Sequence, residues 1–169
     1  MINLYDKKIK EVKIGRVKIG GDNPVAIQSM TNISAKNKNA VLSQIKAFEK
    51  AGCDILRIAI PDEENARAVS FIKENSDLPL VADIHFDYRL ALLCIERGID
   101  KVRINPGNIG SEENVKKVAL AAKEKNIPIR IGINGGSLEK ELLEKHGGIT
   151  PEAMVESAEK QMKLLNRYD

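Results

Sequence analysis

The sequence has no tryptophan, and aromatic residues make up only 4% of its 169 positions. With no aromatic series for base stacking and a net charge of only +3, nothing indicates a nucleic-acid-binding surface. Long apolar runs are also missing. The longest obvious one, 90–95, is far too short to cross a bilayer, and the N-terminus has no apolar segment of signal-peptide length. We therefore expect a cytoplasmic protein that binds neither nucleic acid nor membrane.

Cysteine is scarce as well, with only Cys53 and Cys94, which form no C-x-x-C pair. Both lie in apolar stretches, so we expect buried, reduced thiols and no disulfide framework. Two thiolates are too few for the usual ligand set of an iron–sulfur cluster. We expect the chain itself to bind no metal and no cofactor.

What the sequence does contain is a regular alternation of strand-like and amphipathic stretches. We predict strands near 25–30, 54–60, 79–85, 100–105 and 127–133, and helices near 38–51, 63–75, 87–97, 112–126 and 151–167. Repeated strand–helix units with short connections are typical of a parallel sheet. Before them, the alternating segments 12–14 and 17–19 and the breaker at 20–24 predict a short β-hairpin.

A weak internal repeat indicates how the units are arranged. The segments 52–58 and 98–104 both read G-x-D-x-x-R-I, which places Arg57 and Arg103 at matched positions of their strands. Such self-similarity is typical of a barrel, whose units present equivalent positions to one centre. The fold class predicted is α/β: a partial TIM (β/α)8-type barrel of about five parallel units. Residues 1–24 are expected to form a hairpin that closes the barrel bottom, and 25–169 an incomplete barrel domain.

Several residues at the expected element boundaries have the right chemistry for capping. Gly52 and Gly98 follow helices where a left-handed residue is wanted. Asp87, Ser111 and Thr150 can each accept a hydrogen bond from the first turn of the helix that follows. These residues support the predicted ends of the helices.

Polar side chains share one face of two neighbouring predicted strands. In 81–85, Asp83 and His85 have the same parity, and in 101–105 Arg103 and Asn105 do. A parallel strand covered by helices is usually apolar on both faces, so an acid, an imidazole, a guanidinium and an amide on one side need a reason. We propose that the reason is a ligand.

The remaining candidates come from the neighbouring strands. Arg57 and Arg130 each face the same side of the sheet from their own strands, and Asn134 follows the last predicted strand. Gln28, Met30 and Asn32, at the end of the first strand, could line the opening of the same site, although capping and packing explain these three equally well. Arginines converging from separate strands at the carboxyl ends would repel unless an anion neutralised them, and a diphosphate fits the guanidinium fork. The glycine-rich loops 105–111 and 134–137 would let backbone N–H groups approach phosphate oxygens.

Each residue also has a plainer interpretation. Any single arginine could belong to an ordinary ion pair at the barrel rim. His85 could be a structural hydrogen-bond bridge as readily as a proton donor, and Asp83 could orient His85 or pair with Arg57. His85 and Asp83 are therefore only candidates for a catalytic role, whereas the set as a whole predicts a ligand site.

Four motifs of this chain resemble one enzyme family. QSMTN at 28–32, VADIHFDYR at 81–89, RINPGNIG at 103–110 and IPIRIGINGGSLEK at 127–140 are similar to the N-terminal barrel of bacterial 4-hydroxy-3-methylbut-2-enyl diphosphate synthase. The resemblance covers nearly the whole chain. It implies the reductive conversion of 2-C-methyl-D-erythritol 2,4-cyclodiphosphate to hydroxymethylbutenyl diphosphate in the methylerythritol phosphate route to isoprenoids. Electrons would come from flavodoxin or ferredoxin.

The resemblance also implies which residues bind the cyclic diphosphate. The matching positions are Arg57, Asp83, His85, Arg103, Asn105, Arg130 and Asn134, the same positions that the strand-face argument selects. Family enzymes bind a 4Fe-4S cluster through three cysteines and a glutamate of a C-terminal domain, which closes over the barrel of a dimer partner. We expect that domain to be absent here, the chain alone to be inactive, and a homodimer to form.

Two further interpretations stay open at the level of sequence. The chain could be a non-catalytic phosphate-binding half-barrel, or a pterin-type or aldolase-type barrel enzyme with another substrate. No lysine lies at the end of a predicted strand, which argues against Schiff-base chemistry.

Overall fold

Five parallel strands form the centre of the protein. The computed structural model describes residues 9–105 and 107–168. The strands β3 (Gln28–Met30), β4 (Ile55–Ala59), β5 (Leu80–Asp83), β6 (Lys101–Ile104) and β7 (Ile129–Ile131) pair in the order of the sequence. Every pairing is parallel. The predicted sheet is confirmed, although each strand is shorter than the sequence pattern indicated.

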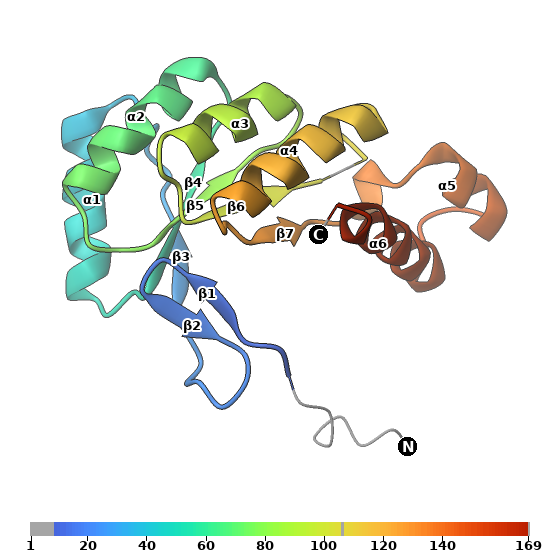
Figure 1. Ribbon diagram of the computed structural model, residues 1–169, viewed down its shortest axis with the longest axis horizontal. Coiled ribbons are helices and arrows are strands. Elements are labelled where there is room, and N and C mark those ends of the chain that lie inside the picture. Colours follow the sequence, from blue (N-terminus) through green and yellow to red (C-terminus); the bar gives the residue numbers. More distant parts are fainter. Residues whose placement is uncertain (1–8, 106, 169) are drawn as a thin grey trace.

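Helices connect successive strands and lie together on one side of the curved sheet (Figure 1). They are α1 (Lys38–Lys50), α2 (Glu63–Glu74), α3 (Tyr88–Glu96) and α4 (Glu112–Glu124). Crossovers of one hand between neighbouring strands put all helices on the same side, as in the wall of a barrel. The predicted partial barrel of the α/β class is therefore confirmed.

The helix-facing side of the sheet is the main apolar core. Leu56, Ile58, Ala82, Val102 and Ile104 are all fully buried there, among the inward residues of the four helices. Ile129 of β7 and Ile127, just before that strand, pack against the same core, as the alternation of isoleucines predicts. The other side of the sheet is left for the residues of opposite parity, which include the charged ones.

The N-terminal hairpin is formed by β1 (Val12–Ile14) and β2 (Val17–Ile19), which pair antiparallel. Ile14 is fully buried against Ile55 and Val81, which belong to the inner face of the sheet near the start of β4 and β5. The hairpin therefore covers the amino-terminal end of the inner face. Figure 1 shows it at one end of the sheet, away from the row of helices.

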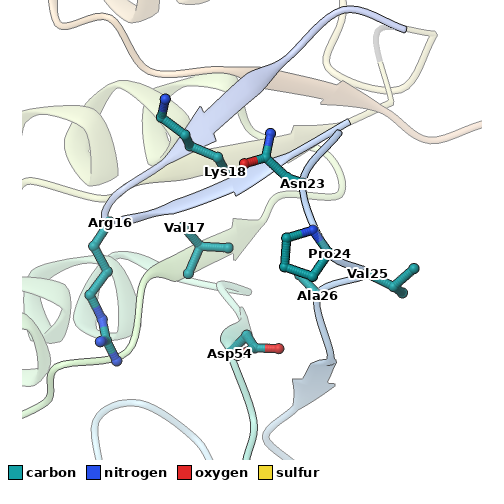
Figure 2. Close-up of a pocket in the computed structure, with 8 residues that line it drawn as sticks. All are labelled: Arg16, Val17, Lys18, Asn23, Pro24, Val25, Ala26 and Asp54. Atoms are coloured by element: carbon teal, nitrogen blue, oxygen red, sulfur yellow. The ribbon is translucent and has the colours of Figure 1, made fainter. Parts of the chain in front are cut away.

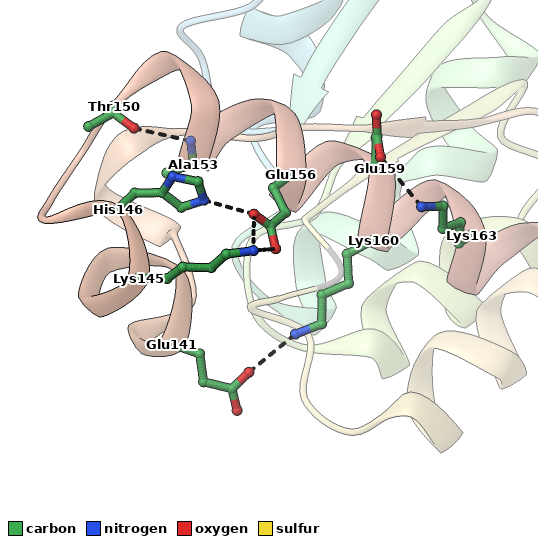
Figure 3. A network of polar contacts seen from close by, with 9 residues as sticks. All are labelled: Glu141, Lys145, His146, Thr150, Ala153, Glu156, Glu159, Lys160 and Lys163. Atoms are coloured by element: carbon green, nitrogen blue, oxygen red, sulfur yellow. Dashed lines mark hydrogen bonds and ion pairs between the residues drawn. The ribbon is translucent and has the colours of Figure 1, made fainter.

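The segment after β7 contains more structure than the sequence pattern predicts. A 3-10 turn at Gly135–Ser137 and the short helix α5 (Lys140–His146) precede α6 (Pro151–Asn166). Lys145 and His146 of α5 both contact Glu156 of α6, with Nζ 2.8 Å and Nε2 2.7 Å from its carboxylate oxygens (Figure 3). The lysine and then the histidine lower the pKa of Glu156. These contacts fix α5 against α6 and shape the loop that leaves β7.

The helix ends agree with the predicted capping residues with one exception. Gly52 and Gly98 each have φ +83°, the left-handed conformation that glycine adopts without strain. Asp87 and Thr150 accept hydrogen bonds from the first turns of α3 and α6. Ser111 is the N-cap residue of α4, as predicted, but its side chain does not make the expected capping hydrogen bond.

None of the helices within the described residues is both long and apolar enough to cross a membrane.

Candidate functional site

The two copies of the internal repeat make the same contact at the start of β4 and of β6, the strands on either side of β5. Asp54 accepts a hydrogen bond from the backbone N–H of Ile27 at 2.7 Å, and Asp100 accepts one from Leu80 at 2.7 Å. Each aspartate thus ties the start of its own strand to the preceding strand. This shared register brings the arginine of each repeat to the inner face, three residues further along the chain.

Both repeat arginines converge on one carboxylate. β5 lies between β4 and β6, so Asp83 stands between Arg57 and Arg103. Arg57 donates from Nε to Oδ2 of Asp83 at 3.1 Å and from Nη2 at 2.5 Å, and Arg103 donates from Nη1 to Oδ1 at 3.2 Å. The side chain of Asp83 is only 1% exposed. A carboxylate this deep needs such partners, because an unpaired buried charge is strongly unfavourable.

His85 lies just beyond the end of β5, at the margin of this ion-pair cluster. Its Nε2 is 3.3 Å from Oδ2 of Asp83, while 53% of its side chain is exposed. The ring is therefore within reach both of the buried carboxylate and of a molecule at the open side. Of the two interpretations of Asp83, pairing with Arg57 is the closer contact, and orientation of His85 is the weaker one.

Asn105 joins the two glycine-rich loops. Its Nδ2 donates to Oγ of Ser137 at 2.5 Å, and its Oδ1 accepts from the backbone N–H of Gly107 at 3.1 Å. Ser137 in turn donates to the carbonyl oxygen of Asn134 at 3.1 Å. Nδ2 thus links the two loops and Oδ1 fixes the turn of the first, so both polar atoms of this buried amide already have partners, whereas the sequence predicts only a ligand contact.

Arg130 and Asn134 lie at the open margin of the site. Arg130 is paired in register with Arg103 on the neighbouring strand, but its side chain is exposed because β7 is the last strand of the sheet. Asn134 is exposed too. Neither side chain makes a hydrogen bond or ion pair with another residue that the structure describes. The cluster thus contains Arg57, Asp83 and Arg103 in direct contact, with these two residues at its rim.

Lys101 is a member of this face that sequence reasoning missed. It lies two residues before Arg103 on β6 and is only 8% exposed, yet no acidic partner is found for it among the described residues. Burial, and then repulsion from Arg130, lower the pKa of Lys101. The sequence did contain a signal for this placement, since Lys101 has the same parity along its strand as Arg103 and Asn105.

The three remaining candidates, at the end of the first parallel strand, differ in where their side chains lie. Asn32 is turned toward α1, where its Oδ1 accepts from Nε2 of Gln44 at 2.6 Å. Gln28 and Met30 are exposed on the inner side of β3, at the open edge of the sheet. Only these last two are available to a ligand from that edge.

A separate pocket lies at the opposite end of the sheet. Figure 2 shows it between the hairpin and the segment that enters β3, with Arg16, Lys18 and Asp54 among its lining residues. All three have partners: Arg16 donates from Nε to the carbonyl oxygen of Asp77, Lys18 pairs with Glu11, and Asp54 accepts from Ile27. The pocket is therefore part of the contact between hairpin and barrel, and lies apart from the arginine cluster.

The cysteines do not form a metal site. Cys53 and Cys94 are both buried and free, and burial raises the pKa of Cys94 to about 12. Over residues 9–105 and 107–168, no group of three or more histidine, cysteine or acidic side chains could hold a metal ion. The donor set of this part of the chain does not fit an iron–sulfur cluster.

Charge is the dominant chemical property of the inner face. Arg57, Arg103 and Arg130 lie on this face with one carboxylate, Asp83, which pairs with the first two. Positive charge is therefore in excess there, and Lys101 adds to it from the amino-terminal end of β6. Guanidinium groups match phosphate oxygens in charge and geometry. The arrangement can therefore bind a phosphate or diphosphate group.

Solved structures of other proteins share this architecture. The dihydropteroate synthase of Yersinia pestis matches with a TM-score of 0.59 and 11% identity, over 91% of this chain and 58% of that one. The 7,8-dihydropteroate synthase of Vibrio fischeri gives 0.56 and 14%, over 74% and 50%. At such low identity the likeness shows the fold alone.

Curated relatives are much closer in sequence. The 4-hydroxy-3-methylbut-2-en-1-yl diphosphate synthase (flavodoxin) of Caldanaerobacter subterraneus subsp. tengcongensis is 60% identical over 161 residues, which is 95% of this chain and 45% of the relative. The enzyme of the same name from Fusobacterium nucleatum is 57% identical over 164 residues, 97% of this chain and 46% of the relative. The chain thus spans a little under half the length of these relatives. Residues 9–169 match the family model of the GcpE TIM-barrel domain, and the chain belongs to this family.

Proposed function

We propose that this chain is the substrate-binding barrel portion of a flavodoxin-dependent 4-hydroxy-3-methylbut-2-enyl diphosphate synthase. The reaction would be the reductive opening of 2-C-methyl-D-erythritol 2,4-cyclodiphosphate to hydroxymethylbutenyl diphosphate. Relatives that are 57–60% identical carry that enzyme name. The inner face would hold the diphosphate through Arg57, Asp83, His85, Arg103, Asn105, Arg130 and Asn134.

One observation carries the proposal. Arg57 and Arg103 come from equivalent positions of β4 and β6, the two strands on either side of β5, and are held by the same buried carboxylate, at 3.1 and 3.2 Å. Asp83 thereby fixes two guanidinium groups before a ligand arrives, and such preorganisation reduces the entropy lost on binding. It neutralises only one of the two positive charges, so the pair retains affinity for an anion.

The roles of the other residues follow from their positions. Arg130 and Asn134 at the rim would approach the phosphate from the side of β7. His85, which is half exposed and 3.3 Å from Asp83, is placed to donate a proton or a hydrogen bond to an oxygen of the bound molecule. Asn105 would act mainly by fixing the two loops beside the ligand, through its hydrogen bonds to Ser137 and Gly107.

The reduction itself needs a redox group that these residues do not supply. Flavodoxin is part of the name of the relatives, and ferredoxin could take its place. A 4Fe-4S cluster would supply the electrons. Because the donors in the described part of this chain do not fit it, we assign no step through the cluster to these residues. The barrel portion would bind and orient the substrate, and act in the cytoplasm as a homodimer.

Calorimetry with the cyclodiphosphate tests the binding role. We expect Arg103→Ala to weaken the affinity by about 1.5–3 kcal/mol, the range for a hydrogen bond to a charged group. The matched control is Arg67→Ala, which removes the same charge from an exposed position on α2, where Arg67 pairs with Glu63. Equal affinity of the Arg103→Ala variant and the unmodified chain would remove the arginine from the site.

Mixing this chain with the part of a relative that it does not match tests the catalytic assignment. If the barrel portion is complemented by the rest of a synthase chain, reductive turnover of the cyclodiphosphate with reduced flavodoxin should appear. Binding without turnover in that mixture would favour a non-catalytic phosphate-binding barrel. Turnover that persists in the Arg103→Ala variant would contradict the proposed site.

A further inference from the structure

A close approach between β6 and the end of β7 singles out a glycine that sequence reasoning had not assigned. Gly132 follows β7 and donates its backbone N–H to the carbonyl oxygen of Ile104 at 2.8 Å, which continues the pairing with β6. A Cβ built on Gly132 would collide with three atoms of one side chain: Nε, Nη2 and Cζ of Arg103. The guanidinium of Arg103 therefore occupies the space that any larger residue would fill.

The glycine is needed for room and not for its backbone conformation. The φ of Gly132 lies outside the left-handed region, unlike those of Gly52 and Gly98. An alanine could adopt this backbone without strain. What it could not do is coexist with Arg103 in its present position, since real Cβ atoms do not approach other heavy atoms so closely.

The contact also determines how the guanidinium of Arg103 is oriented. Nη1 donates to Asp83, whereas Nε and Nη2 lie on the side that faces Gly132. The bare backbone at Gly132 therefore decides where the guanidinium group can lie. The side chain is only 8% exposed, which leaves it little other space.

We propose that Gly132 is a positioning residue for anion binding: its missing side chain gives the guanidinium of Arg103 the space in which it bonds Asp83, and so holds this positive charge at the place where a phosphate group would bind. This inference rests on the proposed function, because it assigns the anion to Arg103. It adds a residue without any polar side-chain atom to a site otherwise formed by charged and amide groups.

The affinity of the 169-residue chain for inorganic pyrophosphate, measured by calorimetry, tests the proposal in a double-mutant cycle. Gly132→Ala should weaken binding about tenfold or more, comparable with Arg103→Ala, since both disturb one charged hydrogen-bonding group. The double variant should bind no more weakly than Arg103→Ala alone, because the methyl group then has nothing to displace. The proposal would be overturned if the losses of affinity of the two single variants multiplied in the double variant, or if Gly132→Ala left the affinity unchanged.

A second glycine separates positioning from a general loss of stability. Gly52 lies at the end of α1 with φ +83°, and a Cβ there would meet no atom within 4 Å. Gly52→Ala should lower the melting temperature through backbone strain and leave the pyrophosphate affinity unchanged. If Gly52→Ala weakened binding as much as Gly132→Ala, a merely structural role would explain both.

Thermal unfolding keeps the inference testable if the unmodified chain fails to bind pyrophosphate, a result that would count against the proposed function. Gly132→Ala should then lower the melting temperature in the presence of Arg103 and have little effect in the Arg103→Ala background. An equal loss in the two backgrounds would show that Gly132 does not act through Arg103.

Discussion

The inner face of the sheet has two regions that differ in chemistry although they lie on the same strands. At the amino-terminal end, Ile55 and Val81 pack under Ile14 of the hairpin, and all three are at most 3% exposed. Two residues further along β4 and β5, the same face carries Arg57 and Asp83. We call the first region the floor and the second, together with Arg103, the charged layer.

The difference shows how one barrel separates stability from binding. The floor needs no partner of particular geometry, because apolar burial is favourable in proportion to the area removed from water. The charged layer is stable only while Asp83 pairs with its two arginines, because a buried charge without a partner is strongly destabilising. Changes in the floor should therefore alter stability alone, whereas changes in the charged layer should alter binding as well.

The largest expected effect is that of Asp83→Ala in the charged layer. This variant leaves Arg57 and Arg103 without their shared carboxylate, and we expect the free energy of unfolding to fall by about 3–5 kcal/mol. Denaturant unfolding followed by circular dichroism measures it. The control is Asp87→Ala, which removes an N-cap carboxylate at α3 and should lower the free energy of unfolding by about 1 kcal/mol. Equal losses would mean that the buried pairs contribute no more than a helix cap.

The next largest effect is expected for Ile14→Ala in the floor. Ile14→Ala opens a cavity between hairpin and sheet, and we expect it to lower the free energy of unfolding by about 2–4 kcal/mol. The affinity for the cyclodiphosphate should stay the same, since Ile14 touches the sheet at the end away from the arginines. A large loss of affinity in a folded Ile14→Ala variant would show that the two regions are not independent.

A smaller effect, of opposite sign, is expected at Lys101. Replacing this buried ammonium by methionine should raise the free energy of unfolding at neutral pH by up to about 1–2 kcal/mol, because apolar replacement of buried charge is neutral or stabilising. It should also weaken anion binding slightly. Lys46→Met, at an exposed position of α1, should change neither quantity.

The pH dependence gives this prediction a distinctive signature. Burial, and then Arg130, hold the pKa of Lys101 below its ordinary value of 10.5. Between the lowered pKa and 10.5, the unfolded chain binds more protons than the folded one, so the stability of the unmodified chain rises with pH. The advantage of Lys101→Met should therefore be largest near neutral pH and shrink as the pH approaches 10.5. A difference in the free energy of unfolding between the two chains that stays constant over this range would contradict the lowered pKa of Lys101.

Much of the fold could be predicted because its signals are local. The alternation of isoleucines at 127–133 and the glycines after α1 and α3 depend only on neighbouring residues. The structure confirms the glycines, and it confirms the packing of the isoleucines for Ile127 and Ile129. The helix α5 was missed because it is seven residues long and is fixed by contacts of Lys145 and His146 with Glu156, ten or more positions away. The position of the N-cap at Ser111 was predicted correctly, whereas the hydrogen bond expected from its hydroxyl to the first turn of α4 is not formed.

The sequence by itself determined which side chains share the inner face, because residue parity along a strand leaves no choice. It also placed Arg57 and Arg103 at equivalent positions, through the repeat. Only the tertiary structure decided that both arginines bind Asp83, since this depends on β5 lying between β4 and β6. It alone showed that Lys101 is buried without an acidic partner among the described residues and that Gly132 leaves room for Arg103, because space and burial arise only when strands distant in sequence lie side by side.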